Sequence, residues 1–142
     1  MTLRIEKTLF PESSDVSFLT DQINEDSMKL GIHEKSSAFA FFIRDENEAI
    51  VGGCNGFVIY GAIYTDQLWI HEAHRRRGLG SKLMKKVHDW GREMACDLAT
   101  VCTMSFQKAR TFYECLGYKC DFEREGYFNG AKCIFMKKNL KE

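Results

Sequence analysis

The chain has 142 residues, of which 44% are hydrophobic and 28% charged, and its 20 basic and 20 acidic side chains leave no formal net charge. This size and composition are those of one globular domain, residues 1–142, with a core of its own. A neutral chain has no bulk attraction to nucleic acid or to an anionic membrane, and no apolar run approaches the length of a membrane span, so we expect neither partner.

The first residues and the cysteines indicate a cytoplasmic protein. Met1–Glu6 lacks the charged and then apolar layout of a secretory signal. The six cysteines are scattered without a Cys-x-x-Cys pair, so we expect reduced thiols in or near the core. His71 and His74 have no cysteine cluster or matching carboxylate beside them, and we therefore expect no bound metal.

In chain order, the N-terminal part predicts a strand and then a helix. Thr2–Leu9 alternates loosely in hydrophobicity and is closed by Phe10-Pro11, which is typical of a first strand. Ser13 or Ser14 can cap a helix that ends near Gly31. The apolar residues of this helix recur on one face: Val16, Leu19, Ile23 and Met28.

Three strands are predicted next, and the turns between them are short enough for hairpins. They cover Ser37–Arg44, Ala49–Tyr60 and Ala62–His71, and we expect them to form an antiparallel meander. Gly52 and Gly53 inside the second strand indicate a bulge or a close backbone contact.

The C-terminal half alternates helices and strands. A helix over Gly78–Met94 leads to a buried strand over Leu98–Met104, and this strand–helix–strand order places Leu98–Met104 parallel to the strand before the helix. A shorter helix over Gln107–Leu116 is stopped by Gly117. The last two predicted strands form a hairpin over Tyr118–Glu125 and Ala131–Lys138.

The connection into the longer helix has the features of an anion site. An apolar strand ends in a basic loop, and Leu79, Leu83, Val87 and Trp90 then recur at helical spacing. Gly78 and Gly80 lack Cβ atoms, so the backbone can bend sharply and a ligand can approach closely. A helix start also offers unpaired N–H groups and the positive end of its dipole. The stretch therefore predicts a pyrophosphate site, although glycines also occupy such turns for steric reasons alone.

Two familiar nucleotide-binding motifs do not match this turn. Gly78-Leu79-Gly80 is followed by Ser81-Lys82-Leu83, so the third glycine of the dinucleotide fingerprint is missing. The Gly-Lys-Ser/Thr ending of the P-loop is also missing. Both interpretations are therefore disfavoured.

Two stretches carry a resemblance to a known family. Arg75–Gly80 resembles the Gln/Arg-x-x-Gly-x-Gly/Ala acyl-CoA signature of the GNAT N-acetyltransferase superfamily, and Ala109–Tyr118 resembles that family's later motif, Ala-x-x-Phe-Tyr-Glu-x-Leu-Gly-Phe/Tyr. The resemblance implies an α/β fold with a mixed, mostly antiparallel sheet of six to seven strands. In this fold the central parallel pair is splayed, and helices flank the sheet.

The resemblance also implies acetyl-CoA as co-substrate. The backbone amides of Arg76–Lys82 would hold its pyrophosphate, and Arg75 or Arg77 would add charge-assisted contacts. Backbone groups of Leu68 and Ile70 would face the pantetheine arm in the gap between the splayed strands. The expected cofactor-binding residues are Leu68, Trp69, Ile70, Arg75, Arg76, Arg77, Gly78, Leu79, Gly80, Ser81 and Lys82.

Tyr113 and Asp66 are the candidate catalytic residues. Tyr113 matches the tyrosine whose hydroxyl donates to the departing sulfur in the family, and the high pKa of a phenol suits that role. Phe112 and Tyr113 are alternatively a packed aromatic pair. Asp66 precedes Leu68 by two residues, which places it on the same sheet face, and it is the candidate base. Glu72, at the loop edge, is the second candidate.

One position departs from the family pattern. Many relatives have an asparagine seven residues before the tyrosine, whereas this chain has Phe106, so that cofactor contact is not carried over. The variant Ser105-Phe106-Gln107 resembles a subgroup that includes small-molecule and antibiotic acetyltransferases. The resemblance therefore implies an enzyme that acetylates a primary amine, more often of a small molecule than of a protein side chain. The acceptor contacts are expected from Met28–Lys35.

Other functions remain open from sequence alone. A non-catalytic acyl-CoA sensor and a protein lysine or N-terminal acetyltransferase would share these motifs. A nucleic-acid-binding protein using Arg75–Lys86 is disfavoured by the neutral charge. The sequence names neither the acceptor nor the length of the acyl group. Dimers are common among similar proteins, but no residue here specifies a homodimer.

Overall fold

A computed structural model describes residues 1–34 and 36–141, which form two units, one on each side of residue 35. The N-terminal unit contains one helix, α1 (Ser13–Lys29), which follows Glu12 in extended conformation. Neither Ser13 nor Ser14 is the N-cap residue, and Gly31 follows the end of the helix at a φ of +87°. The predicted apolar face of α1 is exposed at Val16, Leu19 and Ile23.

The strand predicted at the N-terminus is wrong. Residues 2–9 form no strand, and the side chains of Leu3, Ile5 and Leu9 are exposed. An extended segment becomes a strand only when another strand pairs with its N–H and C=O groups, and no described residue does so here. Alternating hydrophobicity alone was therefore insufficient evidence.

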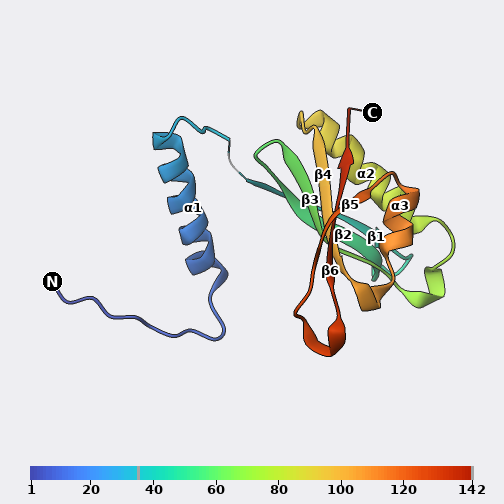
Figure 1. The fold of residues 1–142 in the computed structure, drawn as a ribbon, viewed down its shortest axis with the longest axis horizontal. Coiled ribbons are helices and arrows are strands. Elements are labelled where there is room, and N and C mark those ends of the chain that lie inside the picture. The colour runs from blue at the N-terminus through green and yellow to red at the C-terminus, as the bar shows by residue number, and fades with distance from the viewer. Residues whose placement is uncertain (35, 142) are drawn as a thin grey trace. The chain divides into compact units, whose positions relative to one another are not determined.

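The second unit is built on one sheet of six strands, in the order β1-β2-β3-β4-β6-β5 (Figure 1). All neighbouring pairs are antiparallel except β3 and β4, which are parallel, as the resemblance implied. The strands are β1 (Ser37–Arg44), β2 (Ile50–Ile59), β3 (Ala62–Ile70), β4 (Leu98–Met104), β5 (Lys119–Arg124) and β6 (Cys133–Asn139).

Two α-helices accompany this sheet, α2 (Leu79–Glu93) and α3 (Arg110–Cys115). The second is shorter than predicted, because Ser105–Gln107 forms a 3-10 turn and Lys108 has a left-handed backbone with a φ of 56°. Gly117 ends this region at a φ of +94°, as expected. No helix among residues 1–34 and 36–141 is long and apolar enough to cross a membrane.

The core lies between α2 and the sheet. Leu83, Met84 and Val87 of α2 are buried against Ile63 of β3 and Met136 of β6. This helix also buries a polar pair, in which His88 Nε2 and Tyr118 Oη share a hydrogen bond of 2.8 Å. Cys54, Cys102, Cys115, Cys120 and Cys133 are free thiols, and Cys54 and Cys133 are buried whereas Cys115 is exposed.

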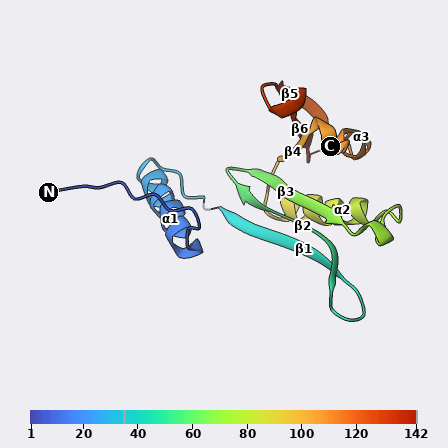
Figure 2. The same ribbon diagram turned by 90° about the horizontal axis from the view of Figure 1, so that it is seen from below.

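The parallel strands β3 and β4 pair along only part of their length. Their register runs from Ala62 opposite Leu98 to Thr65 opposite Val101, and beyond this point they separate. Figure 2 shows β1, β2 and β3 grouped with α2, and β4, β5 and β6 grouped with α3. The splayed parallel pair is therefore present.

A bulge coincides with the point of separation. Gly56 of β2 is opposite Thr65 while Asn55 is opposite Gln67, so Asp66 is an extra residue in β3. A Cβ on Gly56 would lie 1.8 Å from the carbonyl oxygen of Tyr64, so only glycine fits the backbone as it stands. This bulge therefore belongs to β3 and lies opposite Gly56. Gly52 and Gly53, where the sequence indicated a bulge or a close contact, have close backbone or side-chain contacts, and the pairing of β1 with β2 also shifts beside Gly52, where Ile43 is opposite Gly52 and Arg44 is opposite Ile50.

Candidate active site

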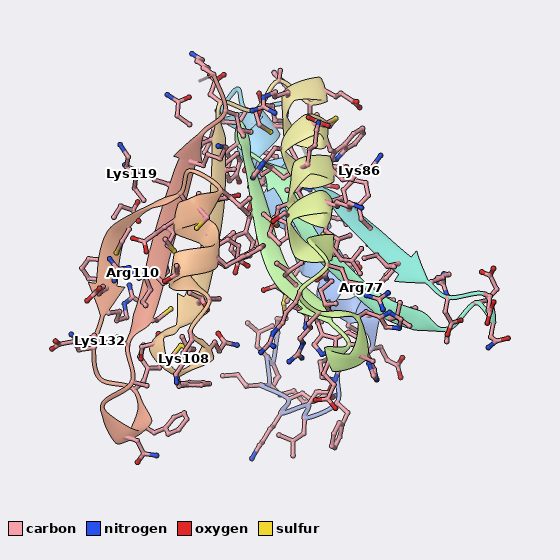
Figure 3. All side chains as sticks on the ribbon, turned by 90° about the vertical axis from the view of Figure 1, so that its right-hand side faces the viewer. Arg77, Lys86, Lys108, Arg110, Lys119 and Lys132 are labelled. Carbon is pink, nitrogen blue, oxygen red and sulfur yellow. The ribbon has the colours of Figure 1, made fainter. Side chains whose placement is uncertain are left out.

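A cleft of about 740 Å³ lies at the separated ends of β3 and β4. An adjoining hollow of about 280 Å³ lies over the loop between β3 and α2, and the two share Ile70, Arg75, Gly80 and Phe112. Figure 3 shows Arg77 on the loop that leads into α2 and Lys108 on the connection that leads into α3. The cleft is lined by Asp66, Gln67, Leu68, Trp69, Ile70, Arg75, Gly80, Cys102, Thr103, Gln107, Ala109, Phe112 and Tyr113.

The start of α2 presents backbone donors to the hollow. The first helical bond runs from the N–H of Lys82 to the carbonyl of Gly78 at 3.0 Å, and the N–H groups of residues 76–81 have no acceptor among the described residues. Gly78 precedes the helix in left-handed conformation, at a φ of 75°, with open space at its Cβ position. Unpaired donors at a helix N-terminus fit an anion such as a diphosphate.

Gly80 has a different role from Gly78. Its backbone is helical, and a Cβ there would lie 3.2 Å from Cζ of Phe112. The absence of a side chain at Gly80 therefore lets the Phe112 ring of α3 lie against the first turn of α2. The expected bend belongs to Gly78, and the close approach at Gly80 is made by the protein's own aromatic ring.

Arg75 fixes the end of β3. Its Nε donates to the carbonyl oxygen of Ile70 at 2.8 Å, and its side chain lines both the cleft and the hollow. This bond uses one donor of the guanidinium group and leaves the remaining N–H groups for other acceptors.

The backbone of β3 alternates between its two neighbours. The N–H of His71 donates to the carbonyl of Val51 at 2.8 Å, so the antiparallel alternation directs the polar groups of Trp69 to β2 as well. Leu68 and Ile70 then direct theirs to the other side, where β4 has separated from β3. Leu68 thus directs its N–H and C=O groups, and Ile70 its N–H group, to the cleft, whereas the carbonyl of Ile70 already accepts from Arg75 Nε and Trp69 is directed to β2.

Tyr113 lines the cleft from α3 and is 7% exposed. Burial raises the pKa of its phenol to about 12, with smaller contributions from Cys54 and Cys102. Its ring packs edge-on against Phe112, at 5.1 Å between centroids, and against Tyr118, at 5.5 Å. Tyr113 therefore belongs to a packed aromatic group and also reaches the cleft as a protonated hydroxyl.

Asp66 lines the same cleft from the bulge in β3. Because Asp66 is an extra residue in β3, side chains do not alternate regularly between Asp66 and Leu68, and the reason for expecting both on one face of the sheet was wrong. The Asp66 side chain lies next to that of Tyr64, whose Oη donates a 3.3 Å hydrogen bond to Oδ1 of Asp66. Glu72, the second candidate base, lies in an exposed 3-10 turn and is not among the residues that line the cleft.

Gln107 is a cleft residue that the sequence did not single out. This residue follows Phe106, the position where the family asparagine is absent, and it lines the cleft, whereas Phe106 is 56% exposed and packs against Phe128. Oε1 of Gln107 accepts hydrogen bonds from Met104 N at 2.8 Å and from Thr103 Oγ1 at 3.0 Å. The signal available in the sequence was a polar residue directly after Phe106, the position that differs from the family pattern.

The two loop histidines serve the loop itself. His71 Nδ1 accepts a hydrogen bond from the N–H of Ala73 at 3.1 Å, and its ring packs edge-on against that of His74. Within the described part of the chain, no three His, Cys, Asp or Glu side chains are grouped as a metal site.

Comparison with known proteins agrees with this fold. The model of the acetyltransferase (GNAT) family matches residues 2–118. A blasticidin-S acetyltransferase from Streptomyces morookaense is 33% identical over 103 residues, which are 72% of this chain and 75% of that protein.

Solved structures agree at the level of the fold. An acetyltransferase from Bacillus cereus superposes with a TM-score of 0.76 at 22% identity, over 96% of this chain and 97% of the other. A structure described as a candidate streptothricin acetyltransferase from Bacillus anthracis, in complex with acetyl coenzyme A, superposes with a TM-score of 0.65 at 16% identity, over 72% and 62% of the two chains.

The chain therefore belongs to the GNAT family of acetyltransferases, and it is an N-acetyltransferase. Enzymes of this family use acetyl-CoA as the acetyl donor. The sequence motifs around Gly78 and Tyr113 thus identified the correct family, and the structure brings both motifs to one cleft.

Proposed function

We propose that this protein transfers the acetyl group of acetyl-CoA to a primary amine of a small molecule. The observation that carries the proposal is the meeting, around one cleft, of unpaired helix N–H groups, exposed strand backbone and a protonated phenol. The relative from Streptomyces morookaense, which is named as an acetyltransferase of blasticidin-S, supports a small acceptor.

In this proposal the N–H groups of residues 76–81 hold the diphosphate of the donor, and Arg75, which lines the hollow, or Arg77 adds charge-assisted contacts. The open backbone of Leu68 and Ile70 binds the amide groups of the pantetheine arm. The single domain of residues 1–142 is part of the same proposal. Lys35, which the acceptor prediction included, lies outside the described residues.

Tyr113 acts as the general acid. As the amine nitrogen bonds to the thioester carbon and the C–S bond breaks, the phenolic proton of Tyr113 passes to the departing sulfur. A pKa near 12 keeps this proton on the phenol at neutral pH. Asp66 takes the proton that the amine loses, directly or through water, and returns it to solvent, and the Tyr113 phenolate regains a proton from solvent.

The test is ligand-dependent stability followed by turnover. Acetyl-CoA binding to the folded protein should raise its melting temperature in proportion to the logarithm of its concentration. A panel of primary amines is then added, and release of free CoA thiol is followed with a thiol reagent that is added after quenching, because the chain has free cysteines of its own. If acetyl-CoA does not raise the melting temperature, the proposed donor site is overturned. A shift without thiol release from any amine favours the acyl-CoA sensor.

A further inference from the structure

Gln107 has one occupied end and one open end. Its Oε1 accepts from two donors, Met104 N at 2.8 Å and Thr103 Oγ1 at 3.0 Å. A backbone N–H can only donate, so the atom that faces Met104 must be the oxygen, and the orientation of the amide is fixed by chemistry. The NH2 group of Gln107 therefore points away from both partners, and no described residue accepts from it.

The open NH2 group belongs to a residue that lines the cleft from the β4 and α3 side. The opposite wall is β3, where the backbone of Leu68 and Ile70 is directed to the same opening. Two walls with hydrogen-bonding groups suit a chain that carries its own donors and acceptors. The pantetheine arm of CoA is such a chain, because it contains two amide groups.

We propose that the Gln107 amide NH2 donates a hydrogen bond to a pantetheine carbonyl of the bound donor. The inference rests on the proposed function, since it names one more residue of the same acyl-CoA site. Gln107 is a binding residue in this assignment and takes no part in proton transfer.

Gln107→Glu isolates the open end. The carboxylate keeps an oxygen for Met104 N and Thr103 Oγ1, so the turn before α3 stays in place, but the NH2 donor becomes an acceptor facing a carbonyl. We expect the affinity for CoA, measured by isothermal titration at pH 7.5, to fall about tenfold or more, while the melting temperature without ligand stays within about 2 °C.

Fragments of CoA separate a contact with the arm from a general effect of charge. 4′-Phosphopantetheine should lose affinity for Gln107→Glu as CoA does, whereas 3′,5′-ADP, which lacks the arm, should bind both proteins alike. Gln67→Glu places the same charge in the same cleft, from a residue with no proposed contact to the arm, and serves as the matched control.

The possible results separate the proposed donor site from the contact assigned to Gln107. If the wild-type protein binds CoA and Gln107→Glu binds it equally well, the assignment of Gln107 is overturned and the proposed function stands. Equal weakening of CoA and 3′,5′-ADP by Gln107→Glu, or equal weakening of CoA by Gln67→Glu, also overturns the assignment. If the wild-type protein does not bind CoA, the donor site and the assignment fall together.

Discussion

Strands β3 and β4 are paired in their first residues and separate in the residues that follow. Residues 62–65 match residues 98–101 in register, whereas residues 66–70 and 102–103 line a cleft with no pairing between them. The separation begins at the bulge opposite Gly56, which belongs to β2. The gap between β3 and β4 on one side of β3 therefore begins where a bulge interrupts the pairing of β3 with β2 on its other side.

Gly56→Ala is expected to have the largest effect, because it removes the boundary between the paired and the open segments. The new Cβ would lie 1.8 Å from the carbonyl oxygen of Tyr64, and a backbone atom cannot move aside as a flexible side chain can. We expect the free energy of unfolding, measured in urea, to fall by about 3 kcal/mol or more. Asn55→Ala, one residue earlier, is the control. A Gly56→Ala protein as stable as wild type would contradict this role of the bulge.

Tyr113→Phe tests the open segment alone. The substitution keeps the packed ring and removes the hydroxyl, so we expect kcat to fall about 100-fold with little change in the affinity for CoA. Stopped assays of thiol release give kcat, and isothermal titration gives the affinity. Because the pKa of Tyr113 is raised to about 12, the wild-type rate should show no loss that belongs to this phenol below about pH 10. Unchanged kcat would remove Tyr113 from catalysis.

His88 tests the buried region around α2, away from the cleft. The pKa of His88 is lowered from 6.5 to about 4, and burial is the largest cause. The positive charges of Lys138 and Arg92 contribute to this lowering, and the negative charge of Asp89 opposes it. Below pH 6.5 the unfolded chain therefore binds a proton that the folded protein does not, and stability is lost as pH falls from 6.5 toward 4.

The expected size of this loss is on the order of 1 kcal/mol at pH 5.5 relative to pH 8. His88→Gln should remove this part of the pH dependence, whereas the same change at the exposed His33 should not. Urea unfolding at several pH values measures the difference. An identical pH dependence in wild type and His88→Gln would show that another group titrates.

Much of the second unit could be predicted because the sequence features that specify it are local, or follow one another along the chain in an order that allows one arrangement. Short turns between apolar runs predicted the meander, and the strand–helix–strand order predicted the one parallel pair. The site motifs were also local, since the loop before α2 and the segment around Tyr113 each supply their part of the cleft from consecutive residues.

The remaining features depend on residues that are distant in sequence. Residues 2–9 have a strand-like pattern but no pairing partner among the described residues, and a pattern does not reveal whether a partner exists. The bulge at Asp66 arises from Gly56 on the neighbouring strand, so counting along β3 alone misplaced the carboxylate. The orientation of the Gln107 amide depends on a nearer partner, Met104 N three residues before it, but the sequence pattern predicted a helix there and not the 3-10 turn that brings the two together.

The contact between Gly80 and Phe112 has a consequence for protein engineering. The helix that presents the anion-binding amides and the helix that carries the phenol touch at a position where even a methyl group would press on the ring. A mutational library that varies either helix separately would therefore disturb both. Randomising positions 80 and 112 as a pair, with small and large residues exchanged, is the design that this contact recommends.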